Sequence, residues 1–269
     1  MGAIREVNKN KMPYHIFPPA PPLRPYIDMY WLLTGYRAEK EIVTLLPDGG
    51  VTLVLNLGEV VRSKQYDAPI RNEGIYLVGT MLQSDEQELH GESRLLGIQF
   101  RPGAFTHFYR YASMNRLANQ VQEFEQNLFP DLQKTTRYFV PYLDQFYLDR
   151  LSPPKYSLMA MVEDIERHGG QTKTGLLAKR HFTTERQLER QFNQQIGVSP
   201  KEFMNLTRFK HTFQKIQHNR NQRSLSDIAW ECGYYDHAHL TNDFKRYMGT
   251  TPTALILSYF SKTLASGPR

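Results

Sequence analysis

The spacing of apolar residues divides the 269-residue chain into a part with short alternating runs and a part with helical periodicity. Between residues 27 and 101, runs rich in Val, Leu, Ile and aromatic residues alternate with turn sequences such as Pro47-Asp48-Gly49-Gly50. Short strands separated by regular turns are typical of a small β-barrel or sandwich. The strands predicted in this way cover 27–33, 41–46, 51–57, 75–80, 87–90 and 95–101, with an exposed loop at 66–72.

The segments that flank these strands have other patterns. Six prolines between residues 13 and 25 exclude a regular helix and indicate an extended arm or an edge strand. From 105 to 150 the spacing becomes helical, with Leu117, Phe124 and Leu128 among the apolar positions. The aromatic stripe that follows, which includes Tyr142, Phe146 and Tyr147, is interpreted as core. Ser152-Pro153-Pro154 is then expected to be a stiff linker.

Two copies of one pattern occupy the C-terminal part. The first copy contains Leu188, Phe192, Gly197 and Pro200, and the second repeats these landmarks 52 residues later at Leu240, Phe244, Gly249 and Pro252. Upstream, Leu177-Ala178 matches Ile228-Ala229 at an offset of 51, so the second copy carries one extra residue in its turn. Internal repetition at a constant offset indicates a repeated supersecondary unit.

Each unit is predicted to be a helix-turn-helix. Thr174 is expected to cap the first helix of the first unit, and Thr184 with Gln187 has the spacing of a capping box for the second. Asp236 begins the corresponding helix of the second unit. These second helices bury one apolar face and expose a polar one, which suits the major groove of DNA. The alternative is that each polar stripe is an ordinary solvated helix face. The stripes comprise Arg186, Glu189, Arg190 and Asn193, and Ala238, Thr241, Asn242 and Lys245.

Residues 155–260 resemble the DNA-binding domain of the AraC/XylS family of bacterial transcription regulators, on the strength of Ile228 to Tyr234 and the landmarks that follow. The resemblance implies two units held apart by one linker helix, here Pro200 to about Asn219, so that they enter successive major grooves. It places base contacts at Arg186, Glu189 and Arg190, and at His237, Ala238, Thr241 and Asn242. It makes Arg208 a phosphate-positioning residue, with an intramolecular ion pair as the alternative. His237 and His239 either contact phosphate or cap their helix.

Charge and cysteine content agree with this interpretation. The net charge is +6, and residues 151–269 hold 17 Lys and Arg against 10 Asp and Glu, so all of the excess lies with the repeat. Neutralisation of DNA phosphates requires such an excess. The single cysteine, Cys232, excludes a disulfide framework and is expected to be a small buried residue. The polar N-terminus and the absence of long apolar runs predict a cytoplasmic protein without a membrane segment.

The N-terminal half is expected to be a regulatory domain, because the resemblance implies a half that binds a small-molecule effector, forms a homodimer, or both. Arg101 is a candidate anion clamp for an effector, with a packed ion pair to a carboxylate such as Asp48 as the alternative. Asp48 itself suits turn chemistry better than catalysis. An enzyme is not expected, because His15, His90 and His107 are far apart and no phosphate-cradling loop is present.

The sequence therefore predicts a multidomain α and β protein. A β-rich, barrel-like or sandwich-like N-terminal domain with helices spans 1–150, and an all-α domain with two helix-turn-helix units spans 151–269. The predicted function is sequence-specific regulation of transcription, most naturally activation, with promoter DNA and RNA polymerase as partners and no cofactor or metal. The alternatives are a nonspecific architectural DNA-binding protein and an enzyme domain fused to a DNA-binding domain.

Overall fold

Two long antiparallel strands, β2 (Ile27–Leu45) and β6 (Asp85–Phe100), form the centre of the N-terminal sheet. The computed structural model describes residues 14–65, 69–110, 113–131, 139–219 and 223–255. The strand order is β1-β2-β6-β3-β5-β7, and all neighbours are antiparallel. β4 pairs with the N-terminal half of β6. The shorter strands are β1 (Tyr14–Phe17), β3 (Val51–Asn56), β4 (Arg62–Ser63), β5 (Ile75–Val78) and β7 (Val121–Glu123).

Four of the predicted strands are merged into two. The polar stretch that had suggested an interruption of β2 continues as strand, because its groups find partners across the sheet. Arg37 lies opposite Gly91 in the register and donates hydrogen bonds to Ser93 Oγ (2.8 Å) and to Glu41 Oε2 (2.8 Å). A register shift between Arg37 and Glu41 marks a bulge that absorbs the extra residues. The merged predictions are 27–33 with 41–46, and 87–90 with 95–101.

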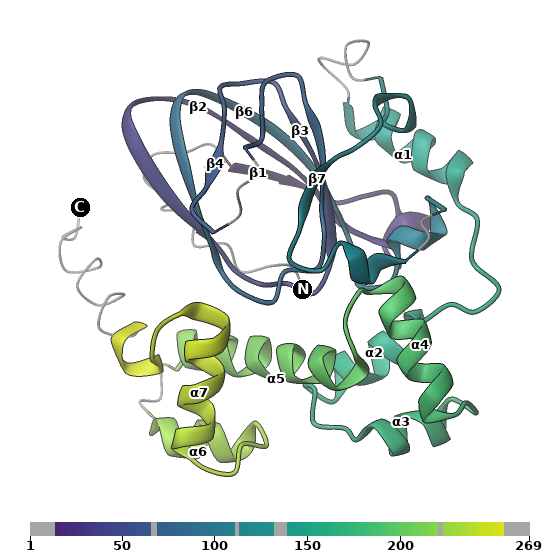
Figure 1. Ribbon diagram of the computed structural model, residues 1–269, viewed down its shortest axis with the longest axis vertical. Coiled ribbons are helices and arrows are strands. Elements are labelled where there is room, and N and C mark those ends of the chain that lie inside the picture. The colour runs from purple at the N-terminus through teal and green to yellow at the C-terminus, as the bar shows by residue number, and fades with distance from the viewer. Residues whose placement is uncertain (1–13, 66–68, 111–112, 132–138, 220–222, 256–269) are drawn as a thin grey trace.

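Each face of the sheet carries its own apolar cluster. One face packs against α1 (Phe139–Arg150), which contributes Leu143 and Tyr147, both fully buried. The aromatic stripe is thus core where Tyr147 is concerned, as predicted. The opposite face is lined by a second cluster that includes Trp31, Val54 and Leu95. An antiparallel sheet with two buried faces must be covered on both sides, and the strong curvature of β2 and β6 achieves this on the second face (Figure 1).

The prediction of helix from 105 onward is wrong for the described residues up to 131. Only 3₁₀ turns occur there, at Phe105–His107, Met114–Arg116 and Gln126–Leu128, together with strand β7. The apolar spacing fits a helix, but the backbone pairs with β5 instead: Phe124 N donates to Ile75 O at 2.8 Å. Pairing with a partner far away in the sequence has overridden the local periodicity.

Two segments near the sheet edges also differ from expectation. The proline-rich arm forms edge strand β1, as the sequence allows, and then a 3₁₀ turn at Pro21–Leu23. The loop expected to be exposed at 66–72 is described only from 69, and there Ile70 is buried. Ile70 forms a β-bridge with Val61 and its carbonyl accepts a hydrogen bond from Asn56 Nδ2 (2.9 Å).

The C-terminal part is helical and contains both predicted units. The helix α5 runs from Pro200 to Gln217, and its apolar residues enter two separate cores. Phe203 and Met204 pack with the first unit, whereas Phe209 and Phe213 pack with the second. The prediction of a linker helix that serves as a common spine is confirmed. The remaining helices are α2 (Met159–Arg167), α3 (Thr174–Arg180), α4 (Glu185–Gln195), α6 (Leu225–Glu231) and α7 (His237–Met248).

Helix caps fix where the second helix of each unit begins. Thr184 accepts a hydrogen bond from the Gln187 amide, and Gln187 returns one to the Thr184 amide, so the predicted capping box is present. Asp236 caps α7 through the His239 amide (2.7 Å). The expectation that Thr174 caps α3 is wrong: the cap position is Lys173, and no side chain satisfies it.

The sheet domain, formed by the described residues up to Arg150, lies along one side of α5 and above both helix-turn-helix units (Figure 1). The helical domain begins with α2 and places α3 and α4 at one end of α5 and α6 and α7 at the other. The two units are therefore separated by the length of α5 and share the sheet domain as a common neighbour.

Candidate nucleic-acid interface and a cavity in the sheet domain

The outer face of α4 presents a row of polar side chains at the surface. Leu188 and Phe192 are buried beneath it, so the orientation of the helix is fixed. Arg186 and Arg190 are exposed, and within the described residues neither has a recorded ion pair or hydrogen bond. Two free guanidinium groups on one helix face can each donate a pair of hydrogen bonds to guanine.

Two other predicted contacts of the first unit are engaged with each other. Asn193 Nδ2 donates to the Glu189 backbone carbonyl at 2.9 Å and to its carboxylate at 3.3 Å. Glu189 remains exposed and retains acceptor capacity, whereas the Asn193 amide is half-buried and partly used.

The equivalent face of α7 is less charged. Leu240 and Phe244 are buried, and His237, Ala238 and Asn242 are exposed on the other side. The remaining predicted contacts are exposed Lys245, half-buried Thr241, whose Oγ1 is 3.5 Å from His237 Nδ1, and half-buried His239, whose ring packs against Tyr234.

Arg208 forms an intramolecular ion pair, which was the predicted alternative to a phosphate contact. Its guanidinium lies 3.4 Å from Asp243 Oδ2 and 4.6 Å above the centre of the Tyr234 ring, and its side chain is only 15% exposed. These contacts tie α5 to α7, so Arg208 holds the second recognition helix against the spine.

Several other basic side chains of the helical domain are engaged in ion pairs and are therefore less available to bind DNA. Arg180 and His181 contact Asp164, while Lys215 and Arg223 both contact Glu231. Exposed lysines without a recorded ion pair among the described residues are better placed to contact phosphates. Besides Lys245, they include Lys173, Lys179 and Lys201, which the sequence analysis had not identified as candidate contacts.

Exposed aromatic residues are a further feature that the sequence analysis missed. Phe182, in the turn of the first unit, is 99% exposed, and Trp230 and Tyr235, beside the turn of the second, are 81% and 90% exposed. The sequence could have predicted this exposure. These aromatic residues lie in or beside the turns and are not among the repeated apolar positions that form the cores of the units. Cys232 is fully buried as predicted, and burial raises the pKa of its thiol.

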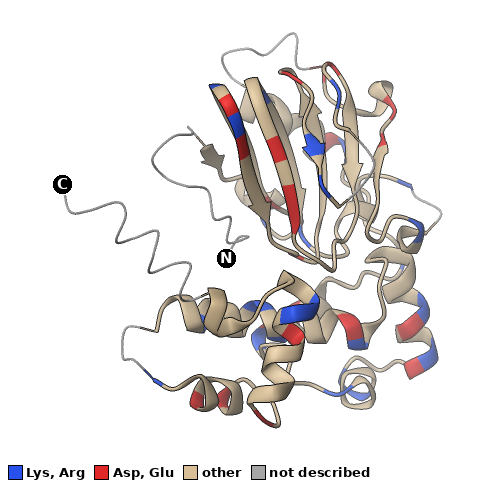
Figure 2. Ribbon diagram, turned by 60° about the vertical axis from the view of Figure 1, so that its left-hand side comes forward, with Lys and Arg blue, Asp and Glu red and all other residues tan. Residues whose placement is uncertain are grey.

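α5 sets the separation of the two recognition faces. A helix of 18 residues is about 27 Å long, which is comparable with the 34 Å that separates successive major grooves on one side of the duplex. Lys and Arg are interspersed with Asp and Glu along the helices of this domain (Figure 2).

Asp48 and Arg101, the candidate effector residues, are both engaged in protein contacts. Asp48 Oδ1 accepts a hydrogen bond from the Gly50 amide (3.0 Å), which is turn chemistry. The alternative role predicted for Arg101, a packed ion pair with a carboxylate, is the one observed. Its partner is Glu166 of α2, with Nη2 2.7 Å from Oε2, and not Asp48. Both residues line a polar cavity of about 220 Å³ between the sheet domain and α5.

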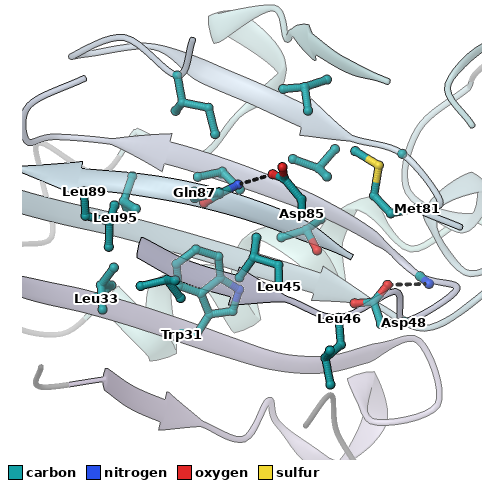
Figure 3. A pocket seen from close by; sticks show the side chains of 18 of the residues that line it. Trp31, Leu33, Leu45, Leu46, Asp48, Met81, Asp85, Gln87, Leu89 and Leu95 are labelled. Atoms are coloured by element: carbon teal, nitrogen blue, oxygen red, sulfur yellow. Dashed lines mark hydrogen bonds between the residues drawn. The ribbon is translucent and has the colours of Figure 1, made fainter. Parts of the chain in front are cut away.

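A second, apolar cavity of about 100 Å³ lies inside the curved sheet. Leu33, Leu89 and Leu95 lie toward one end of it, and Leu46, Asp48 and Met81 lie toward the other (Figure 3). Its walls are mostly aliphatic, with Trp31 along one side. The buried carboxylate of Asp85 accepts hydrogen bonds from Ser63 Oγ (2.6 Å) and Gln87 Nε2 (3.2 Å).

The three histidines of the N-terminal half are not assembled into a site. His15 lies on β1 and His90 on β6, and His107 is buried with its Nε2 3.0 Å from Ser157 Oγ. Among the described residues no group of three His, Cys, Asp or Glu side chains is arranged to hold a metal ion. Over the same residues, none of the helices has both the length and the apolar character needed to cross a bilayer.

Comparison with known proteins gives separate matches for the two parts of the chain. Residues 15–123 match a domain of unknown function (DUF6597), and residues 177–256 match a helix-turn-helix domain. The transcriptional activator RhaS of Escherichia coli O139:H28 is 30% identical over 95 residues, which are 35% of this chain and 33% of RhaS. The match thus spans about a third of the length of the curated relatives.

Among solved structures, ToxT of Vibrio cholerae is similar with 9% identity and a TM-score of 0.48, covering 92% of this chain and 98% of that chain. A ToxT structure from strain SCE256 with a bound unsaturated fatty acid has 12% identity and a TM-score of 0.45, covering 86% of this chain and 94% of that chain.

Proposed function

We propose that the chain is a DNA-binding transcription regulator of the AraC/XylS family, and that α4 and α7 read two successive major grooves of one asymmetric promoter site. The observation that carries the proposal is the pair of equivalent, exposed polar helix faces mounted on a single spine. If only the first unit bound DNA, there would be no reason for α7 to keep its polar face exposed as well.

In the first unit, Arg186 and Arg190 supply base contacts, because their guanidinium groups are exposed and unpaired within the described chain. Glu189 accepts from a cytosine amino group, while Asn193 supports Glu189 through its hydrogen bonds. The expected readout is therefore rich in G·C pairs.

In the second unit, Asn242 pairs with adenine and Ala238 offers only a methyl contact, for instance to thymine. His237, Thr241 and Lys245 contact the flanking bases or phosphates, while His239 supports the start of α7. Lys173, Lys179 and Lys201 add salt-dependent phosphate affinity. Arg208 acts at one remove, by holding α7 in place.

For the remaining parts of the chain we propose residues 1–150 as a regulatory domain and 151–269 as the DNA-binding domain. The apolar cavity in the sheet is the proposed effector site, and a homodimer contact is a second role for this domain. The protein acts in the cytoplasm on promoter DNA, as an activator that contacts RNA polymerase.

A pull-down of fragmented genomic DNA on the purified full-length protein, at about physiological salt, tests the proposal. We expect enrichment of a few asymmetric sites that contain two short boxes about one helical turn apart. The control is the triple variant Arg186→Ala, Arg190→Ala, Asn242→Ala, which should retain weak binding but lose the enrichment. Uniform recovery by the unmodified protein would instead support the architectural alternative.

A further inference from the structure

Residues 79–85, which comprise the connection from β5 to β6 and the first residue of β6, contact the apolar cavity and the helical domain with alternate residues. The segment bends at Leu82 and Gln83, and its side chains and backbone groups reach both surfaces. The residues that line the cavity are Gly79, Met81, Gln83 and Asp85, and those that contact the helical domain are Thr80, Leu82 and Ser84.

The outward-facing residues contact the C-terminal ends of both recognition helices. Thr80, which is 1% exposed, donates through Oγ1 to the carbonyl of Ile196, the C-terminal cap residue of α4 (2.5 Å). The Ser84 amide donates to the carbonyl of Tyr247 in the last turn of α7 (2.7 Å). The last carbonyls of a helix have no partner within the helix, so each of these bonds supplies one.

Leu82 lies between those two hydrogen bonds and packs against the apolar cores of both units. Its own position is fixed from the sheet domain, because its amide donates to Asn119 Oδ1 at 2.8 Å. Leu46, at the same end of the cavity, also packs against the core of the second unit (Figure 3). The chain segments that form this end of the cavity wall are thus also in contact with both units.

We propose that residues 79–85 couple the occupancy of the apolar cavity to the relative placement of the two recognition helices. This inference rests on the proposed two-groove binding and on the proposed effector site. A molecule that displaces Met81 must also move Leu82, its neighbour in the chain, and so change how the two units are held. A ligand shifts the arrangement by as much as its affinity differs between the two arrangements.

The shape and lining of the cavity define the ligand class. Its volume of about 100 Å³ is below that of a 150 Å³ apolar cavity that accepts benzene, so the ligand is no larger than a small aromatic or branched aliphatic molecule. The polar lining residues are Asp48, Thr52, Gln83, Asp85 and Gln87, and the two carboxylates among them favour a ligand with a hydrogen-bond-donating group, such as a small amine or alcohol.

Cavity filling provides a test that needs no known ligand. Val54→Phe extends a wall residue into the cavity, and Leu82→Ala removes the contact with both units. Leu57→Ala is the matched control, because Leu57 is a partly exposed leucine of the sheet domain that lies outside both helical cores. Affinity is measured for the full two-box site and for a site with one box, with all variants as full-length protein.

We expect Val54→Phe to change the affinity for the two-box site by about fivefold or more, and to leave one-box binding unchanged. In the Leu82→Ala background the change should disappear, whereas in the Leu57→Ala background it should persist. If Val54→Phe prevents folding, as judged by a lost unfolding transition, Val43→Leu fills the cavity more gently and replaces it.

Two results would overturn the coupling. An equal effect of cavity filling with and without Leu82→Ala would mean that the signal takes another route. A folded, filled protein with unchanged two-box affinity would mean that the cavity is not coupled to DNA binding. Both differ from failure of the proposed function, in which the unmodified protein would not discriminate the two-box site from random DNA.

Discussion

At the scale of single residues, the decisive distinction is between cations that are free and cations that are already paired. Arg190 and Arg208 are equally plausible DNA contacts in the sequence, since both lie on helices of the repeat region. In the structure Arg190 is exposed without a recorded partner among the described residues, whereas Arg208 contacts Asp243 and the Tyr234 ring. A paired, half-buried guanidinium must lose its partner before it can bind a base or phosphate, so the two residues have different roles.

Arg190→Ala is expected to lower affinity for the selected site by about 1–3 kcal/mol and to relax specificity at one base pair, with little effect on random DNA. The physical reason is the loss of a bidentate contact to a base edge. Fluorescence anisotropy titrations at one salt concentration measure both affinities.

Arg167→Ala is the control for that substitution, because it removes the same charge from an exposed ion pair on α2, away from the recognition faces. If Arg190→Ala weakens binding to every sequence equally, Arg190 contacts phosphate and not a base.

At the scale of elements, local hydrogen bonding determines where each recognition helix begins. The Thr184 side chain and Gln187 satisfy amides at the start of α4, which would otherwise have no partner. Thr174, by contrast, lies within α3 and does not cap it. Of the two threonines predicted to cap a helix, only Thr184 does so and is expected to stabilise its helix in this way.

Thr184→Ala is expected to lower the free energy of unfolding by about 0.5–2 kcal/mol, because the capping hydrogen bond is lost. Thr174→Ala should change it much less, since alanine is a good helix former and no cap is removed. Urea denaturation followed by circular dichroism measures both. Similar losses for the two variants would show that the capping box contributes little to stability.

At the scale of the whole molecule, the sheet domain makes specific contacts with both units and with the spine. Lys210 of α5 donates to the Asp48 carbonyl (2.6 Å), and Arg101 pairs with Glu166. Gly197, in the loop after α4, approaches the backbone of Met114 so closely that an added Cβ would lie 2.6 Å from its carbonyl oxygen. These contacts favour one relative placement of the two domains.

The repeat supplies a matched pair for testing this contact, because Gly197 and Gly249 occupy equivalent positions. Both have positive φ, at 98° and 68°, so alanine is strained at either, at a cost of about 1–2 kcal/mol. Only Gly197 is crowded, since nothing lies within 4 Å of a Cβ at Gly249.

Gly197→Ala is therefore expected to be more destabilising than Gly249→Ala by at least about 1 kcal/mol, in urea unfolding of the full-length protein. Equal losses would show that the close approach of the domains at Gly197 does not persist in solution.

Local patterns in the sequence determined the helical domain. The repeat, the capping box of α4 and the periodicity of α5 predicted two units on one spine, because helix hydrogen bonds and caps join residues only a few positions apart. The strand positions were predicted only in part, and β7 was missed. A strand is stabilised by a partner that lies far away in the chain, and its own sequence does not name that partner.

Tertiary structure alone decided which polar groups are free. The sequence gives Arg101, Arg190 and Arg208 the same chemistry, and only packing pairs the first with Glu166, leaves the second exposed and places the third against Asp243. The double role of residues 79–85 was also invisible, because it depends on how the sheet cavity and the helical domain lie around this short segment. Local spacing determined how this protein presents its helices, and long-range packing determined what can act on them.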